Sequence, residues 1–261
     1  MGLVKTRNIA IANEKGGVGK STTVINLGAA LTRQGKSVLV VDTDPQANAT
    51  KGLGVDVEEG MITICDIIND PEANSGHDAI IQTGWKGLDL IPSHVDLAGI
   101  EIELVDEEGR ENKLKEGLEE IVGKYDFILI DTPPSLSLLT VNVFTFAKEV
   151  LVPCQTHPYA YGALAELFDT IDAVNEEINP DLNVTGIIPT FFDKRTKISN
   201  KILNSLKTDE RYKDLIFNTA IRVNTTIAES ASVGKPVVFY KKSSYGACDY
   251  IDLANEVLNR A

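Results

Sequence analysis

Disulfide-stapled, membrane-spanning and secreted proteins are disfavoured by what this sequence lacks. Only three cysteines occur in 261 residues, and Cys65, Cys154 and Cys248 form an odd, scattered set. A disulfide framework is therefore not expected, whereas a reducing cytoplasm is. No apolar run approaches the roughly 20 residues that a membrane helix needs, and the N-terminal residues have no signal-peptide core. The cysteines show no metal-ligand spacing, so we expect each to act as a small apolar residue.

Positive charge is also in the minority. The 25 Lys and Arg residues face 38 Asp and Glu residues, which gives a net charge of −13. This excludes a uniformly basic protein but allows a local basic patch. Residues 194–213 contain seven basic and two acidic residues, without a base-reading motif. A non-specific DNA contact is one interpretation and a solvated helix face is the other. The candidate DNA contacts are Lys194, Arg195, Lys197 and Lys242.

Short apolar runs alternate with helical patterns along the whole chain. The strand-like runs are residues 9–12, 37–41, 88–91, 127–130, 150–152 and 184–188. Such runs are typical of a parallel sheet covered on both faces. We expect helical stripes to bury Val122 and Ile178 with their neighbours. The alternation predicts a doubly wound, mostly parallel α/β sheet in a single domain over residues 1–261, which binds ligands at the carboxyl ends of its strands.

A glycine-rich segment follows the first strand and precedes a helical pattern. Its residues are Glu14, Lys15, Gly16, Gly17, Val18, Gly19, Lys20, Ser21 and Thr22. Glycines let several backbone N–H groups point at one anion, and the helix N-terminus adds partial positive charge. Lys20 is placed to reach the β- and γ-phosphates, Ser21 to ligate Mg²⁺, and Thr22 to approach the α-phosphate. Glu14 occupies the first glycine position of the general phosphate-loop motif, and Lys15 adds a second cation.

Three carboxylates follow two other predicted strands. Asp42 and Asp44 are two residues apart, so both face the same side of an extended chain. Such a pair can organise the hydration shell of Mg²⁺ and position the attacking water. Asp131 ends the run at residues 127–130 and is placed to reach Mg²⁺ through water. Thr132 follows where many ATPases carry a catalytic Glu. The base then comes from elsewhere or the water is only positioned, which again points to Asp44, and we expect slow hydrolysis.

The segment Lys15 to Thr22 resembles the deviant Walker A signature of the ParA/MinD ATPase family, and residues 42–48 resemble its second signature. The resemblance covers the chain from Asn8 to about Leu258. It implies a P-loop ATPase that uses ATP and Mg²⁺ and forms a sandwich dimer with ATP. In that dimer Lys15 reaches the partner's phosphates. It assigns catalysis to Lys15, Lys20 and Asp44, and metal contacts to Ser21, Asp42 and Asp131.

The same resemblance extends to DNA and base contacts. Residues 192–196 are similar to a DNA-facing segment of partition ATPases, and the family's usual DNA-contacting arginine falls on Thr226. Arg222 is the candidate replacement. The resemblance also places the adenine base near Thr190, Arg222 and Asn224. It implies non-specific double-stranded DNA, a centromere-binding adaptor of the ParB kind, nucleoid association and no membrane. We expect no N-terminal helix-turn-helix extension and no operator-specific repression.

Two related functions compete with DNA partition. A MinD-like positioning ATPase needs a basic amphipathic helix at its C-terminus, and the last helical pattern here looks like packing against the sheet. A nitrogenase-reductase-like carrier needs paired cysteines, and Cys154 has no companion at a strand end. The acid-rich stretches 56–59 and 101–111 are interpreted as solvated faces or as contacts for a basic partner.

Overall fold

One sheet of seven strands organises the chain. The computed structural model describes residues 5–260, except for the side chains of residues 159–161. The strand order is β3-β4-β2-β5-β1-β6-β7, and every neighbouring pair is parallel except β3 and β4. The strands are β1 (Arg7–Ile11), β2 (Val38–Asp42), β3 (Ile81–Gln82), β4 (Leu88–Ile91), β5 (Phe127–Asp131), β6 (Glu149–Gln155) and β7 (Asn183–Thr190).

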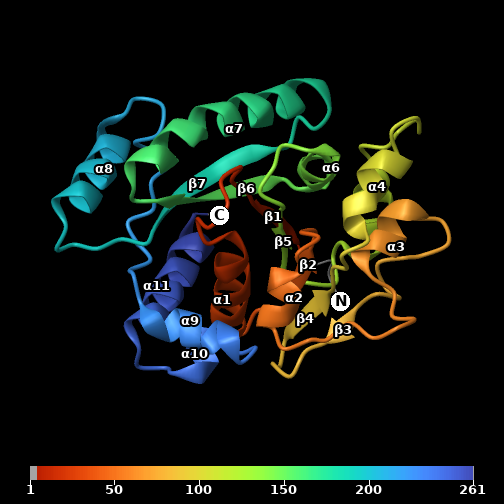
Figure 1. Cartoon of the computed structure of the whole chain (residues 1–261), viewed down its shortest axis with the longest axis horizontal. Helices are drawn as coiled ribbons and strands as arrows, with labels where there is room; N and C mark the ends of the chain where they lie inside the picture. The colour runs from red at the N-terminus through yellow and green to blue at the C-terminus, as the bar shows by residue number, and fades with distance from the viewer. Residues whose placement is uncertain (1–4, 261) are drawn as a thin grey trace.

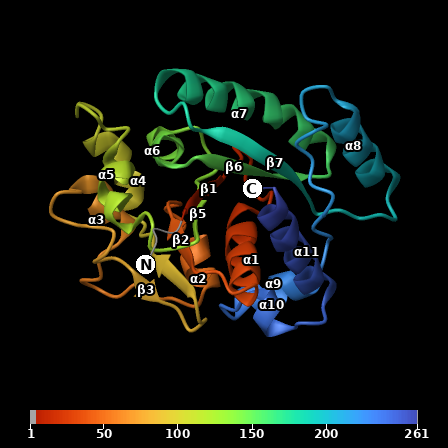
Figure 2. The ribbon, with the colours of Figure 1, turned by 180° about the vertical axis from the view of Figure 1, so that it is seen from behind.

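Helices cover both faces of this sheet (Figures 1 and 2). They are α1 (Lys20–Arg33), α2 (Asn48–Gly52), α3 (Ile64–Asn69), α4 (Leu97–Glu103), α5 (Lys113–Leu118), α6 (Leu138–Phe146), α7 (Pro158–Glu177), α8 (Lys197–Thr208), α9 (Thr225–Ser232), α10 (Val237–Tyr240) and α11 (Tyr245–Asn259), with a 3₁₀ turn, η1 (Glu119–Ile121). The doubly wound, mostly parallel α/β architecture that the sequence predicts is thereby confirmed.

The alternation of side chains along the strands creates two cores. Ile9 and Ile11 of β1 pack with apolar residues of α1, α10 and α11. Ala10, between them, points to the other face and packs with residues of α3 to α7. Because successive residues of a strand point to opposite faces, a strand that is apolar at every position can support both layers.

Four sequence-based expectations need correction. The two-residue strand β3 pairs antiparallel with β4 and was not predicted, because so short a segment carries no periodic signal. Val122 is exposed, since α5 gives way to a 3₁₀ turn and the chain reverses at Gly123, whose φ is 95°. Ile178 is exposed because α7 ends one residue before it. Cys248 lies on the exposed side of α11 and is not an apolar core residue.

Candidate nucleotide-binding site

The carboxyl ends of the three central strands lie at one level. Ile11 of β1 and Asp42 of β2 both stand opposite Asp131 of β5 in the sheet register. The phosphate loop leaves β1, the Asp44 loop leaves β2, and the Pro133–Pro134 loop leaves β5 at this edge. The topology therefore brings together the three segments that the sequence analysis selected separately.

The phosphate loop is shaped by two left-handed glycines and one asparagine. Gly17 and Gly19 have φ values of 74° and 94°, which only glycine adopts readily. Asn13, which the sequence analysis did not select, accepts a hydrogen bond at 2.9 Å from the backbone N–H of Lys15 and donates one at 2.9 Å to the carbonyl of Pro153. The loop is thus tied to β6 and enters α1 at Lys20 with the N-terminal N–H groups facing outward.

Two adjoining cavities lie beside this loop. The first measures about 510 Å³ and is lined by the loop glycines, Lys20, Ser21, Asp44 and Pro134. The second measures about 360 Å³ and is largely apolar. Gly19, Thr22 and Ala231 line both, so the two are continuous. A polar chamber at a helix N-terminus that opens into an apolar cleft suits a ligand with a phosphate tail and a planar base.

Lys20 and Asp131 face each other in the interior. Burial lowers the pKa of the Lys20 ammonium, and the nearby carboxylates of Asp131 and Asp44 act in the opposite direction. Asp131 is fully buried, and neither of its carboxylate oxygens has a hydrogen-bond partner among the described residues. Burial raises the pKa of Asp131 well above its usual range and repulsion from Asp42 adds to this, while Ser21 and Lys20 oppose it. An acceptor in this position needs a cation or an ordered water.

The carboxylate of Asp42 is held by its own set of donors. Its Oδ2 accepts hydrogen bonds from the backbone N–H and the hydroxyl of Thr50 at 2.8 and 2.7 Å, and its Oδ1 accepts one from the Asp44 N–H at 3.2 Å. Burial raises the pKa of Asp42 to about 6, although these donors lower it. Asp42 therefore orders the segment between β2 and α2 as well as facing Asp131.

The Asp44 loop is fixed from the neighbouring strand β4. The Asp44 carboxylate lines the phosphate chamber and accepts a hydrogen bond from the Gln46 N–H at 2.9 Å. Ser93, which follows β4, donates its hydroxyl to the Asp44 carbonyl at 2.7 Å and its N–H to the Thr50 hydroxyl at 3.1 Å. Neither Thr50 nor Ser93 was selected from the sequence. Ser93 lies just after a strand, and this position is the sequence feature that could have identified it as a site residue.

Thr132 and Glu14 occupy two positions where related motifs carry other residues. The Thr132 hydroxyl is buried and donates to the Ile11 carbonyl at 3.0 Å, so it joins β5 to β1. The Glu14 side chain lies at the start of the phosphate loop, where burial and the nearby Glu166 carboxylate raise its pKa.

The apolar cleft is lined by the residues expected to surround a base. Thr190 donates its hydroxyl to the Val18 carbonyl at 2.9 Å, which ties β7 to the phosphate loop. Asn224 caps α9 by accepting from the Thr226 N–H at 2.8 Å. Arg222 forms an ion pair with Asp249, with Nε–Oδ1 at 3.0 Å. Its guanidinium lies over the Tyr245 ring at 4.4 Å from the ring centroid. Its charge is thus largely neutralised, and a DNA contact by Arg222 stays a prediction.

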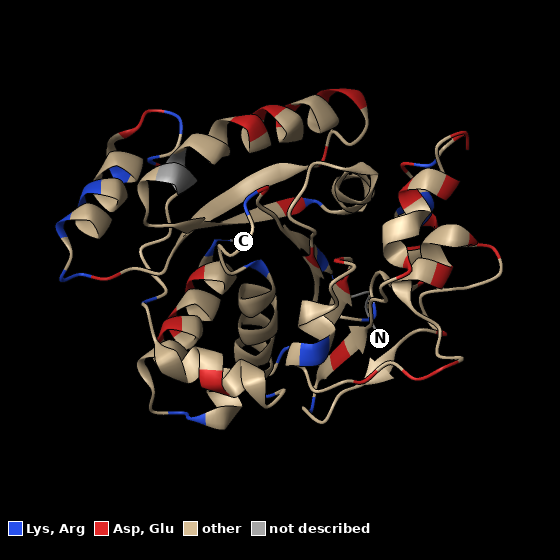
Figure 3. Ribbon diagram, viewed as in Figure 1, with Lys and Arg blue, Asp and Glu red and all other residues tan. Residues whose placement is uncertain are grey.

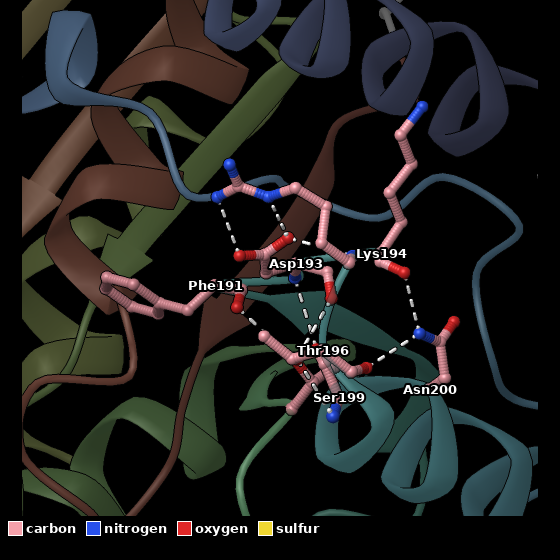
Figure 4. A network of polar contacts seen from close by, with 8 residues as sticks. Phe191, Asp193, Lys194, Thr196, Ser199 and Asn200 are labelled. Atoms are coloured by element: carbon pink, nitrogen blue, oxygen red, sulfur yellow. Dashed lines mark hydrogen bonds and ion pairs between the residues drawn. The ribbon is translucent and has the colours of Figure 1, made fainter.

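Phe191 is an unexpected part of this cleft. Its φ is 49°, in a region that bulky residues rarely adopt, and the residue is 43% exposed. The Thr156 hydroxyl donates to the Phe191 carbonyl at 3.2 Å and contacts the Ser199 hydroxyl at 2.5 Å (Figure 4). This strained residue lies between the base cleft and the start of α8, a position at which strain commonly accompanies function.

The donor set fits Mg²⁺ held largely by phosphates and water. Mg²⁺ prefers oxygen ligands and is usually bound by one or two carboxylates together with substrate phosphates. The Ser21 hydroxyl and the unpartnered Asp131 oxygens supply such ligands. Within residues 5–260, no cluster of three or more His, Cys, Asp and Glu side chains could hold a metal by itself.

The predicted basic patch is divided in space. Lys194, Arg195, Lys197 and Lys201 line an open groove of about 620 Å³ along α8. Figure 3 shows basic residues along this helix. Arg211, by contrast, pairs with Asp169 of α7 at 2.7 Å, and Lys213 pairs with Glu210. Lys242 is exposed in the loop between α10 and α11. Only the α8 part of the 194–213 window therefore presents concentrated positive charge.

The start of α8 is built by short polar contacts (Figure 4). Asp193 binds the Arg195 guanidinium at 3.0 and 2.9 Å, and Arg195 lowers the pKa of Asp193 to about 2. Thr196 caps the helix, and Asn200 donates to the carbonyls of Lys194 and Thr196 at 2.9 and 2.7 Å. These contacts hold the basic side chains at one end of the molecule.

Comparison with known proteins places the chain among nucleotide-dependent ATPases. A family model described as an AAA domain matches residues 6–184. The chain is 43% identical over 252 residues to the sporulation initiation inhibitor protein Soj of Bacillus subtilis, covering 95% of this chain and 97% of Soj. It is 40% identical over 256 residues to the chromosome partitioning protein ParA of Caulobacter vibrioides, covering 97% and 94%.

A solved structure shares the fold of this chain over nearly its full length. The cobyrinic acid a,c-diamide synthase from Mycobacterium smegmatis, with bound ADP and magnesium, is 35% identical and superposes with a TM-score of 0.82 over 97% of this chain and 94% of that one. Sequence relatives and fold agree over nearly the full length. The chain belongs to the ParA/Soj-type partition ATPases of the ParA/MinD deviant Walker A family.

Proposed function

We propose that this chain is a Mg²⁺-dependent DNA-partition ATPase. Its ATP-bound form is a sandwich dimer that binds double-stranded DNA without sequence preference, and hydrolysis releases it. The observation that carries this proposal is the convergence of the phosphate loop, Asp44 and Asp131 on one polar chamber that continues into an apolar cleft. The named relatives Soj and ParA support the partition role.

ATP occupies both cavities in this proposal. The β- and γ-phosphates lie against the loop N–H groups and the Lys20 ammonium, and Thr22 lies beside the α-phosphate. The base enters the cleft of Thr190, Arg222 and Asn224. The Ser21 hydroxyl would ligate Mg²⁺, with Asp131 and Asp42 binding it through water, and the ion would supply charge neutralisation for the phosphates. The buried and unpartnered Asp131 oxygens are the feature that most needs such a cation.

Hydrolysis depends on a positioned water rather than on a strong base. Thr132 rather than a carboxylate follows Asp131, and its hydroxyl donates to the Ile11 carbonyl. Asp44 lines the chamber, and we assign to its carboxylate the orientation of a water toward the γ-phosphate. Slow intrinsic turnover follows from this arrangement. Lys15 precedes the loop glycines, and we assign its ammonium to the partner's phosphates, where a dry interface strengthens the attraction.

DNA binding is assigned to the α8 groove. Lys194, Arg195 and Lys197 stand on its rim, and the Arg195 side chain is 83% exposed in its pair with Asp193. Because an exposed ion pair is weak and screened by salt, a phosphate can replace Asp193 with little loss. Lys242, and Arg222 once released from Asp249, would extend the contact. An adaptor of the ParB kind stimulates hydrolysis, and the protein acts on the nucleoid in the cytoplasm.

The alternative is a MinD-like positioning ATPase for a membrane or protein cargo, and helix α11 does not favour its membrane form. The apolar side chains Ala247, Tyr250 and Leu253 of α11 are buried against the sheet layer and are not free to enter a bilayer. Within residues 5–260, no helix has both the length and the hydropathy to cross a membrane.

The test is DNA binding measured with ADP, ATP and a non-hydrolysable ATP analogue across a salt series. We expect affinity with ATP or the analogue only, and a fall in log affinity with log salt of about 0.9 per phosphate contact. Arg195→Glu should weaken binding and reduce that slope by about 1. Lys86→Glu is the matched control, because Lys86 is exposed in the β3–β4 loop and makes the same charge change. Equal loss in both variants would refute the assignment to α8.

A further inference from the structure

The phosphate loop contacts the residues at the end of β7 and just after it. The Thr190 hydroxyl donates to the Val18 carbonyl at 2.9 Å. The Phe191 ring lies against the loop at Gly19, where φ is 94° and where a Cβ would stand 3.6 Å from the ring atom Cε2. Phe191 also lines the base cleft together with Gly19 and Thr22. A nucleotide in these cavities would therefore contact Phe191 directly in the cleft and indirectly through the loop.

A chain of hydrogen bonds joins the same turn to α8 (Figure 4). The Asp193 N–H donates to the Ser199 hydroxyl at 3.1 Å, and the Ser199 and Thr156 hydroxyls lie 2.5 Å apart. The Thr156 hydroxyl donates to the Phe191 carbonyl at 3.2 Å. Because Thr156 uses its proton on that carbonyl, the Ser199 hydroxyl must donate to Thr156. Both hydroxyls are buried, and hydrogen bonds that run in one direction strengthen one another.

The backbone of Phe191 is the strained point of this turn. Among the described residues, Phe191 and Ala47, which lies in the loop after β2, are the two non-glycine residues with a positive φ. Such strain persists only where the surrounding contacts hold it. Here the Thr156 hydroxyl holds the Phe191 carbonyl, and the Phe192 N–H donates to the Ile221 carbonyl at 3.0 Å. A small change in these contacts can therefore displace the turn from one arrangement to another.

We propose that Phe191, Thr156 and Ser199 are positioning residues that make the placement of α8 depend on the nucleotide. The two hydroxyls hold Phe191 in its left-handed conformation and fix the first turn of α8 to the end of β6. A triphosphate against the phosphate loop shifts the loop contacts of Phe191, which passes the shift through Asp193 to the basic groove. This inference rests on the proposed function and names the segment through which nucleotide binding controls DNA binding. The nucleotide shifts α8 only as far as it binds the two placements with different affinity.

The test combines hydrogen exchange of residues 193–200 with DNA affinity, each measured on the full chain with and without a non-hydrolysable ATP analogue and Mg²⁺. We expect the analogue to change the exchange rates in the wild type and not in Thr156→Val/Ser199→Ala. In that variant the gain in DNA affinity from the analogue should fall by about fivefold or more, while affinity for the analogue stays within about twofold. Thr145→Val is the matched control, because its buried hydroxyl donates within α6, to the Val141 carbonyl at 2.9 Å.

Phe191→Gly tests the strained residue itself. Glycine adopts a φ of 49° without strain and lacks the ring that touches the loop, so we expect the same loss of nucleotide dependence. Thr156→Ser keeps the hydroxyl and should retain the wild-type response. Dimerisation with the analogue, measured by sedimentation, should be unchanged in all of these variants.

Several outcomes would overturn the proposal. One is a wild type in which the exchange of residues 193–200 does not respond to the analogue. Others are a full response in Thr156→Val/Ser199→Ala and Phe191→Gly, or an equal loss in Thr145→Val. A loss of dimerisation in the test variants would assign the segment to the contact between copies instead. Exchange that responds in the wild type and not in the test variants, without any DNA binding, would support the positioning role and refute the proposed function, so the two failures are distinguishable.

Discussion

Replacing Thr50 with valine removes a hydroxyl that joins the carboxyl ends of β2 and β4 while keeping the shape of the side chain. The buried hydroxyl donates to Asp42 Oδ2 at 2.7 Å and accepts from the Ser93 N–H at 3.1 Å. A hydrogen bond to a charged group contributes about 1.5–3 kcal/mol, and a buried N–H left without an acceptor costs about 1–3 kcal/mol. We therefore expect Thr50→Val to lower the free energy of unfolding by about 2.5–6 kcal/mol where Asp42 is ionised.

The pH dependence of this loss of stability separates the contribution of the Thr50–Asp42 hydrogen bond from that of the Ser93–Thr50 hydrogen bond. Burial raises the pKa of Asp42 to about 6 in the folded state, above the unfolded value, so its contribution favours folding at low pH and is lost as pH rises through 6. Thr50→Val raises the folded pKa further, because it removes a donor that favours the ionised form. Urea unfolding without nucleotide should show the larger loss of unfolding free energy at pH 8. At pH 5 only the cost of the Ser93 N–H left without an acceptor, about 1–3 kcal/mol, should remain. Thr50→Ser keeps the hydroxyl and is the control. Equal losses at both pH values, or an equal loss in Thr50→Ser, would refute this reasoning.

Three further predictions concern the same region. Lys20→Met should abolish ATP binding, measured with a fluorescent ATP analogue, because its ammonium is the buried cation of the phosphate chamber; wild-type affinity would contradict the assignment. Asp44→Ala should keep ATP-dependent dimerisation and lose phosphate release, and unchanged turnover would remove Asp44 from hydrolysis. Gly234→Ala should destabilise the fold by more than about 2 kcal/mol in urea unfolding, since its Cβ would lie 2.6 Å from the Gly54 Cα and its φ is 62°. Gly60→Ala, with φ of 85° and open space, should cost only about 1–2 kcal/mol.

The sequence predicts those parts of the site that depend on short stretches of chain. The glycines and Lys20 follow β1 directly, and Asp42, Asp44 and Asp131 end or follow apolar strands, so the strand-end rule finds them. Register then aligns Asp42 with Asp131, which the order of strands implies but no single segment reveals.

The contacts that hold these groups join distant segments and leave no local pattern. Thr50 lies in the five-residue helix α2, and Ser93 reaches Asp44 from 49 residues away. Asp249, 27 residues beyond Arg222, neutralises a charge that the sequence offers as free. The left-handed backbone of Phe191 is also invisible, because an aromatic residue has no intrinsic preference for that conformation.

Tertiary contacts, rather than the order of residues along the chain, determine where charge is concentrated on the surface. The excess of positive charge over residues 194–213 suggests one continuous surface, yet Asp169 and Asp172 of α7 take up Arg211 and leave the charge concentrated on α8. The acidic α4 lies at the opposite end (Figure 3). A polyanion approaching a protein of net charge −13 is therefore repelled except at α8.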